Sequence, residues 1–348
     1  MLSRGQTSAE DSPPIEGAAM MLSAANIKDL SRICLHKSGL INTLSWYNRN
    51  RFQILFYHRF TDGNGCDYSQ ALEKQCAYIS KHFTPVSMSQ IADCLRQGAS
   101  LPPRSVATTV DDGYRDFLTA AFPIFHAYKI PVTVFLITDF IDGQLWPWWN
   151  KVDYAVQHTS RPAVEYSLFP GHPCGPLLCS ANEQRRASSS AICEALKKVP
   201  DRIRVSFVDR LPDLFEVDIP KVTPREYAPL TWNEIRLLQG EGVEFGAHTK
   251  THPVLTQLEG QHALYDEIAG SKSRMEEELR CPITHFAYPN GGFNKEAVAA
   301  VKASGFLTAT TVVSGFNSRL ADQFLLRRRS TGFESSDYYF RESLAGIH

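Results

Sequence analysis

Short apolar runs alternate along most of the chain with stretches in which apolar residues recur at helical spacing. This alternation is typical of strand–helix units and indicates a parallel sheet or barrel of the α/β class. Seven runs predict strands, at Phe52–Tyr57, Ser105–Val110, Val132–Ile137, Val243–Ala247, Ile283–Tyr288, Phe306–Val313 and Phe324–Arg329.

The helices expected between these strands have recognisable ends. Thr231 followed by Glu234 predicts a capping box, with Gly240 as the stop, and Asn294 predicts the N-cap of a helix that ends at Gly305. One further helix has an apolar face formed by Leu264, Ile268, Met275 and Leu279.

The rhythm of the pattern divides the chain into three parts. Residues 1–50 form an N-terminal appendage of unknown role, and residues 51–345 form the barrel. Residues 142–229 break the strand–helix rhythm with many prolines, a Ser-rich run and Trp146, Trp148 and Trp149, so we interpret them as an insertion on the barrel.

Composition narrows the partners and the compartment. The net charge of −1 and the absence of long basic runs predict no nucleic-acid partner and no anionic membrane surface. No segment reaches the roughly 18 apolar residues that a transmembrane helix needs, and no signal peptide is recognisable, so the sequence predicts a cytoplasmic location. The 8 cysteines lack metal-site spacing and are expected to be buried or incidental thiols.

Polar residues fall where the predicted strands end. His58 follows the first strand, Asp111 and Asp112 follow the second, His248 follows the fourth, and Asn290 lies in the turn after the fifth. Barrel enzymes build their active sites from the carboxyl ends of their strands, so these groups are expected to share one site.

The pattern His248-Thr-Lys-Thr-His252 suggests metal binding, because one helical turn would place both imidazoles on one face. Two solvated histidines at a surface turn are the alternative. The adjacent Asp111 and Asp112 point in different directions at a strand end, so one can bind a cation while the other faces substrate. A turn with an N-cap is the alternative interpretation of that pair.

Three segments resemble the first three motifs of the polysaccharide deacetylase family, carbohydrate esterase family 4: Thr109–Gly113, His248–His252 and Phe286–Asn294. The resemblance covers roughly residues 50–335. It implies a distorted, incomplete (β/α)7 barrel in which Asp111 is the base and Asp112, His248 and His252 bind a divalent metal, usually Zn²⁺.

The sequence departs from that family near its C-terminus. Many members supply the general acid from a Leu-x-x-His motif, whereas this chain has Leu325-Leu-Arg-Arg-Arg329 there. His58 resembles the histidine of members with a permuted motif order and is the expected acid, with a structural strand-end histidine as the alternative. The arginine that commonly braces the base is absent from the third motif, so one of Arg327–Arg329 is a candidate, against a solvated strand end.

Other positions are expected to contact the reacting groups or the sugar. The backbone N–H of Asn290 is a candidate oxyanion donor, because that role does not depend on the side chain. Tyr288 either lines the pocket or packs in the core. Trp148 and Trp149 either stack on a sugar ring or anchor the insertion.

The leading functional hypothesis is therefore hydrolysis of N-acetyl groups from N-acetylhexosamine units, with an N-acetylated carbohydrate as substrate. Metal-dependent hydrolysis of a non-sugar amide is a second hypothesis. A catalytically inactive carbohydrate-binding barrel is a third, and it predicts a damaged metal set.

Overall fold

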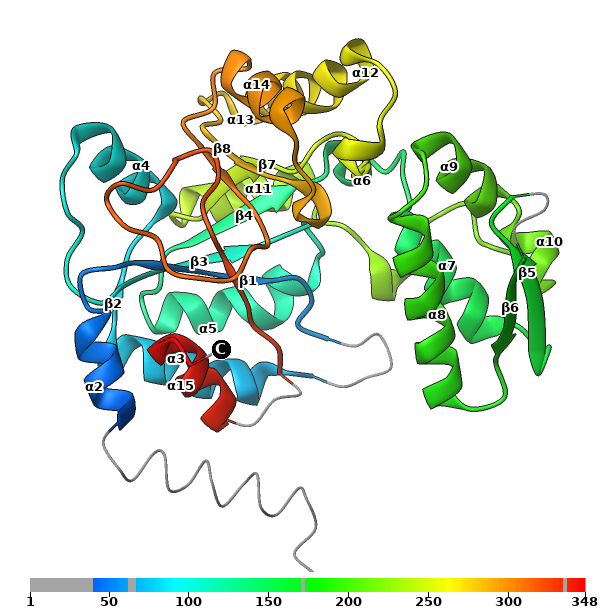
Figure 1. Cartoon of the computed structure of the whole chain (residues 1–348), viewed down its shortest axis with the longest axis horizontal. Helices are drawn as coiled ribbons and strands as arrows, with labels where there is room; N and C mark the ends of the chain where they lie inside the picture. Colours follow the sequence, from blue (N-terminus) through cyan, green and yellow to red (C-terminus); the bar gives the residue numbers. More distant parts are fainter. Residues whose placement is uncertain (1–39, 62–66, 170–172, 334–336, 348) are drawn as a thin grey trace, which may run out of the picture.

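The computed structural model describes residues 40–61, 67–169, 173–333 and 337–347, and its centre is a curled sheet (Figure 1). The strands are β1 Gln53–Tyr57, β2 Thr84–Pro85, β3 Ser105–Val110, β4 Val132–Leu136, β7 Glu244–Ala247, β8 His285–Ala287, β9 Thr308–Thr310 and β10 Arg329–Ser330. They lie in the order β10-β1-β3-β4-β7-β8-β9, with β2 beside β3, and every pairing is parallel.

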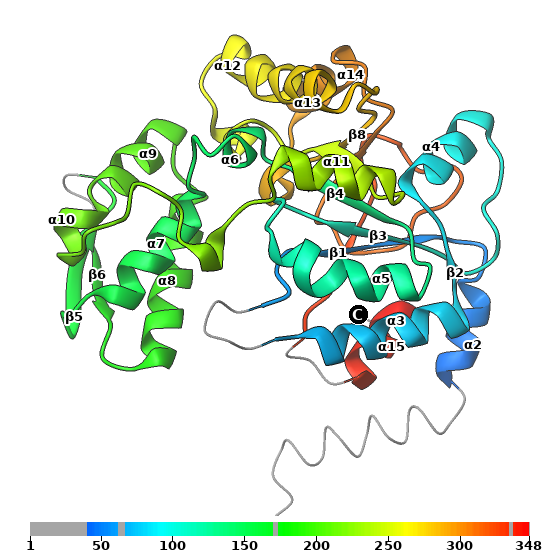
Figure 2. The ribbon, with the colours of Figure 1, turned by 180° about the vertical axis from the view of Figure 1, so that it is seen from behind.

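Helices surround this sheet in both views (Figures 1 and 2). They are α2 Leu40–Tyr47, α3 Ser69–His82, α4 Met88–Gln97, α5 Phe122–Ala127, α6 Thr138–Ile141, α11 Trp232–Gly240, α12 Gln261–Tyr265, α13 Ser271–Leu279, α14 Lys295–Ala303 and α15 Asp337–Ala345. Strands β1, β3 and β4 are buried along their whole length, because the sheet is covered on both faces.

The predicted α/β fold, a distorted and incomplete barrel, is confirmed, and each of the seven apolar runs contributes to the sheet. The sheet curls so far that one parallel bridge, between Thr310 and Leu326, links β9 to the chain just before β10. The last strand is shorter than predicted and begins later. The Asn317 side chain binds both the N–H and the C=O of Arg327, which removes these groups from the ladder.

The predicted helix ends are confirmed. Thr231 and Glu234 form the capping box of α11, which ends at Gly240, and the side chain of Asn294 accepts from the N–H of Ala297 to cap α14. The four predicted face residues are all buried, but their helix is not regularly wound, because a π-turn, Asp266–Gly270, lies between α12 and α13.

Residues 148–215 form a side lobe beside the barrel, drawn in green in Figures 1 and 2. It contains α7 Trp148–His158, β5 Ala163–Ser167, β6 Pro173–Leu178, α8 Asn182–Leu196, α9 Asp201–Asp209 and α10 Leu211–Phe215. The lobe has a hydrophobic cluster of its own, separate from that of the barrel. This lobe lies within the predicted insertion, residues 142–229, whose boundaries stay a prediction.

Residues 1–39 of the predicted appendage lie outside the described residues. The remainder includes α2, which lies against α15, and the Asn48 side chain donates to the carbonyl of Ala345 at 3.1 Å. All cysteines in the described part of the chain are free thiols. None of the described helices has both the length and the apolar character needed to cross a membrane.

The contact between β4 and β7 predicts a glycine requirement. A Cβ at Gly246 would lie 2.5 Å from the buried ring of Phe135 and 2.8 Å from the carbonyl oxygen of His285. We expect Gly246→Ala to lower the free energy of unfolding by about 1–3 kcal/mol through overpacking. Gly240→Ala is the matched control, since its Cβ would meet no atom within 4 Å. Urea unfolding curves measure both, and equal stability would contradict this packing.

Candidate metal and catalytic site

Four parallel strands deliver polar groups to one pocket of about 550 Å³. His58 follows β1, Asp111 and Asp112 follow β3, His248 follows β7, and Asn290 lies in the 3-10 turn after β8. All of them line the pocket, so the structure brings the strand-end residues together as the sequence predicts.

Asp112, His248 and His252 form a buried group whose ligand atoms lie within 4.8 Å of one another. The Oδ1 atom of Asp112 is 3.7 Å from Nε2 of His248 and 3.8 Å from Nε2 of His252. This Oδ1 is buried and has no hydrogen-bond partner among the described residues. A buried carboxylate oxygen facing two imidazole nitrogens fits a divalent cation.

The protonation states of the three groups suit a cation. Burial lowers the pKa of His248 to about 4 and also lowers that of His252, so both rings are neutral and free to ligate near pH 7. Nδ1 of His248 lies 2.7 Å from the carbonyl oxygen of Ala287, which leaves Nε2 as the ligand atom. Burial and the charge of Asp111 raise the pKa of Asp112, a cost that a bound cation offsets.

The prediction that one helical turn joins His248 to His252 is wrong. Residues 248–254 form an irregular loop in which Thr249 (φ 68°) and His252 (φ 57°) are left-handed. Glu267, in the π-turn, fixes this loop: it accepts from the N–H groups of Lys250 and Thr251, at 2.9 Å each, and from the Thr251 hydroxyl. The position of His248 and His252 relative to each other therefore depends on the carboxylate of Glu267, which comes from a separate helix.

Arg328 is the residue that braces Asp111. Its guanidinium makes a bidentate pair with the carboxylate, Nη1 to Oδ1 at 2.7 Å and Nη2 to Oδ2 at 2.8 Å. The arginine is fully buried, and its Nε donates to the carbonyl of Thr311. Burial opposes ionisation of Asp111, but Arg328 more than offsets it, so the pKa of Asp111 is lowered. Of the three candidate arginines, the middle one makes this pair.

Several residues of the same site have strained backbones. Asp112 (φ 75°) and Asn290 (φ 53°) adopt the left-handed region, as Thr249 and His252 do. Each such residue costs on the order of 1–3 kcal/mol. Gly113 follows Asp112 at φ 86°, and a Cβ there would lie 2.8 Å from Leu136. The turn after β3 therefore requires its glycine.

Tyr288 does not reach the pocket. Its side chain is fully buried between Phe286 and Phe293, and its hydroxyl donates to the carbonyl of Phe324 at 3.1 Å. The expectation that its side chain contacts substrate is therefore corrected to core packing. The strand-end alternation explains this, because neighbouring residues point to opposite sides.

The side lobe supplies one wall of the pocket. Trp148 and Trp149, at the start of α7, both line it, and Trp148 also belongs to the core of the lobe. Trp149 packs at 4.5 Å between ring centroids on His252. Glu194, in the last turn of α8, and Lys197, which follows the helix, line the same pocket and form an ion pair with each other at 2.7 Å.

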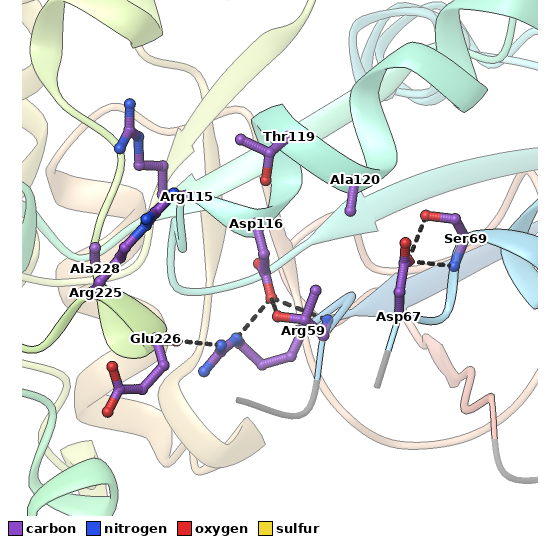
Figure 3. Close-up of a pocket in the computed structure, with 11 residues that line it drawn as sticks. Arg59, Asp67, Ser69, Arg115, Asp116, Thr119, Ala120, Arg225, Glu226 and Ala228 are labelled. Carbon is purple, nitrogen blue, oxygen red and sulfur yellow. Dashed lines mark hydrogen bonds and ion pairs between the residues drawn. The ribbon is translucent and has the colours of Figure 1, made fainter. Parts of the chain in front are cut away.

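A second pocket, of about 520 Å³, is shown in Figure 3 and shares the lining residue Arg59 with the first. Arg59 donates to the Asp116 carboxylate at 2.8 Å and to the carbonyl of Glu226 at 2.5 Å, and both contacts are drawn as dashed lines in Figure 3. Arg115 and Arg225 also line this pocket, and almost all of its lining residues are polar.

Sequence reasoning missed several pocket residues. Arg59 directly follows His58 and Tyr114 lies two residues after Asp112, and this closeness in sequence was an available signal. Glu267, Glu194 and Lys197 lie in segments without any motif, and only the tertiary fold brings them to the site.

Comparisons with known proteins identify a matching family and similar chains. Residues 98–166 and 186–309, more than half of the chain, match the family model described as polysaccharide deacetylase. A poly-beta-1,6-N-acetyl-D-glucosamine N-deacetylase of Escherichia coli (strain K12) is 36% identical over 75 residues. That stretch is 21% of this chain and spans only 11% of the relative's length.

Solved structures share the fold. IcaB from Ammonifex degensii has a TM-score of 0.55 at 16% identity, covering 85% of this chain and 96% of that chain. The deacetylase PplD of Streptococcus pyogenes, in complex with acetate, has a TM-score of 0.54 at 17% identity, covering 85% and 97%. The BpsB deacetylase domain from Bordetella bronchiseptica has a TM-score of 0.51 at 17% identity, covering 81% and 96%.

The Asp111–Arg328 pair predicts a large stability effect. Arg328→Leu leaves a buried carboxylate without a partner, and we expect a loss of about 3–5 kcal/mol in the free energy of unfolding near pH 7. The exposed Arg327→Ala is the control, because the structure bonds only its backbone to Asn317. Chemical denaturation of both variants measures the difference.

The same pair predicts the pH dependence of that loss. The folded-state pKa of Asp111 lies below its unfolded value, so the pair stabilises the protein above about pH 4 and loses its effect as pH falls through the lowered pKa. The deficit of Arg328→Leu is therefore expected to shrink at acid pH. A deficit that stays constant from pH 7 to pH 3 would refute the pairing.

Proposed function

Because this chain belongs to the polysaccharide deacetylase family, we propose that it is a metal-dependent hydrolase that removes N-acetyl groups from N-acetylhexosamine units of a polysaccharide. One observation carries the proposal: the buried Asp112, His248 and His252 group lies beside the Arg328-bound carboxylate of Asp111 in a single pocket. A site with all of these groups argues against an inactive carbohydrate-binding barrel.

Zinc is the proposed cation, held by Asp112, His248 and His252. Two neutral imidazoles and one carboxylate match the three-ligand sets of catalytic zinc sites, which leave a position open. Zinc in such a set polarises a carbonyl oxygen and lowers the pKa of water at the open position.

Asp111 is the proposed base. The bidentate contact with Arg328 fixes the plane of its carboxylate and keeps it ionised. Each carboxylate oxygen has more than one lone pair, so a proton from the attacking water can still be accepted. The base therefore works from a fixed position.

His58 and Asn290 have the remaining proposed roles. An amide anion is too poor a leaving group, so the departing amine needs a proton, which His58 delivers from the same pocket. Desolvation lowers the pKa of His58 and the charge of Asp111 opposes this, so it is the carboxylate of Asp111 that favours the protonated ring needed for the acid role. The backbone N–H of Asn290 donates to the developing oxyanion.

The proposed substrate is a polymer of N-acetylhexosamine. The curated relative is named for poly-beta-1,6-N-acetyl-D-glucosamine, which supports a polymer of this kind. Trp148 and Trp149 offer aromatic surface to a sugar ring, and the polar second pocket, joined through Arg59, offers donors to the hydroxyls of a neighbouring unit.

Removal of a metal ligand tests the function. We expect Asp112→Asn and His248→Ala to lose bound zinc and to lower acetate release from N-acetylglucosamine oligomers by at least about 100-fold, since even partners that only orient ligands are worth 10–100-fold. His126→Ala, an exposed histidine on α5, is the control. Elemental analysis and an acetate assay measure both properties. Unchanged metal content and activity in both ligand variants would refute the proposal.

The second pocket predicts a dependence on chain length. Arg225→Ala removes a charged donor from it, and we expect kcat/KM for long oligomers to fall by about tenfold, the value of one charged hydrogen bond. The shortest accepted substrate should be turned over normally. Arg96→Ala, on the exposed face of α4, is the control. An equal loss for short and long substrates would show that this pocket does not bind the polymer.

A further inference from the structure

The two histidines of the metal group are held in different ways. Nδ1 of His248 has the carbonyl of Ala287 as its partner, at 2.7 Å. Nδ1 of His252 is buried and, within the described part of the chain, has no hydrogen-bond partner. Metal-binding histidines almost always donate this second N–H, because that bond fixes the orientation of the ring. His252 lacks the usual device.

The indole of Trp149 packs against the ring of His252. The ring of Trp149 lies 4.5 Å from the ring of His252, tilted by 59°. The contact covers the imidazole of a residue whose backbone is already strained at φ 57°. Packing of this kind restricts the rotamers of a ring that no hydrogen bond holds.

Trp149 is itself held rigidly to the barrel. Its Nε1 donates to the hydroxyl oxygen of Tyr114 at 3.0 Å, and Nδ2 of Asn150 donates to the same oxygen at 2.8 Å. Tyr114 is fully enclosed, packs edge-on against Phe140, and stands two residues after the ligand Asp112. The first turn of α7 is thereby joined to the loop that carries another ligand.

We propose that the side lobe positions the metal ligand His252 through Trp149, whose indole, anchored on Tyr114, replaces the missing hydrogen bond to Nδ1. The inference rests on the metal site of the proposed function. It assigns Trp149 a positioning role in addition to any contact with sugar. It also gives the lobe a part in metal retention, because α7 is packed into the core of the lobe through Val152, Ala155 and Val156.

Metal binding without substrate tests this role. The apo-protein is titrated with Co²⁺, and affinity is measured by competition with a chelator while the d–d absorption bands report ligand geometry. We expect Trp149→Ala to bind Co²⁺ at least about tenfold more weakly, with altered bands, as for loss of an orienting partner. Trp149→Phe keeps an aromatic ring but loses the N–H that bonds to Tyr114, so it should bind more tightly than Trp149→Ala and about as well as Tyr114→Phe.

Two further variants make the test specific. Trp146→Phe is the matched control, because Trp146 packs on Tyr154 and Tyr227, outside the pocket, and should bind as wild type does. Tyr114→Phe removes the anchor but keeps the ring, so affinity should fall severalfold in a protein that is still folded at the temperature of the titration. This variant keeps the inference testable if Trp149→Ala does not fold.

The outcomes separate the two proposals. Wild-type affinity and bands in Trp149→Ala, or in Tyr114→Phe where the alanine variant is unfolded, would overturn the positioning role alone. A change confined to KM for oligosaccharides, with unchanged Co²⁺ affinity, would overturn it too and leave Trp149 as a sugar contact. A wild-type protein that binds no Co²⁺ would overturn both this inference and the proposed function.

Discussion

The ion pair between Arg328 and Asp111 is the constraint on which the structure depends. Arg328 lies just before β10 and donates to the carbonyl of Thr311 after β9. Its guanidinium packs at 4.5 Å over the ring of Phe56 in β1 and binds the carboxylate of Asp111 after β3. One side chain thus reinforces the place where a single bridge, Thr310 to Leu326, links β9 to the chain before β10. The same contact keeps the proposed base ionised. Arg328 therefore serves both the packing of the barrel and the chemistry of Asp111.

Around this pair, the site contains buried polar groups and strained backbone whose cost in free energy is offset only when all of them are in place. Asp112 is a buried carboxyl beside another carboxylate, Nδ1 of His252 has no hydrogen-bond partner among the described residues, and both residues have left-handed backbones. Such costs persist only where the surrounding fold over-determines them. The Glu267 carboxylate, the turn at Gly113 and the indole of Trp149 supply that determination from three separate parts of the chain.

Local features of the sequence predicted the elements well. The run Ser105–Val110 is β3 to the residue, and the caps at Thr231 and Asn294 hold as side-chain hydrogen bonds, because each depends on neighbours in the chain. Predictions that needed distant partners did less well. Arg328 could be narrowed only to a group of three arginines, and Tyr288 pointed into the core. No periodicity encodes which residue faces a pocket across the barrel.

The π-turn at Asp266–Gly270 has a consequence for how this helix can change over evolution. It inserts part of an extra turn between α12 and α13, so Leu264 can enter the core while Glu267 faces the histidine loop. Deleting one residue would restore regular winding and rotate one segment by about 100° against the other. Lineages of this protein are therefore expected to accept substitutions in this helix far more readily than any change in its length.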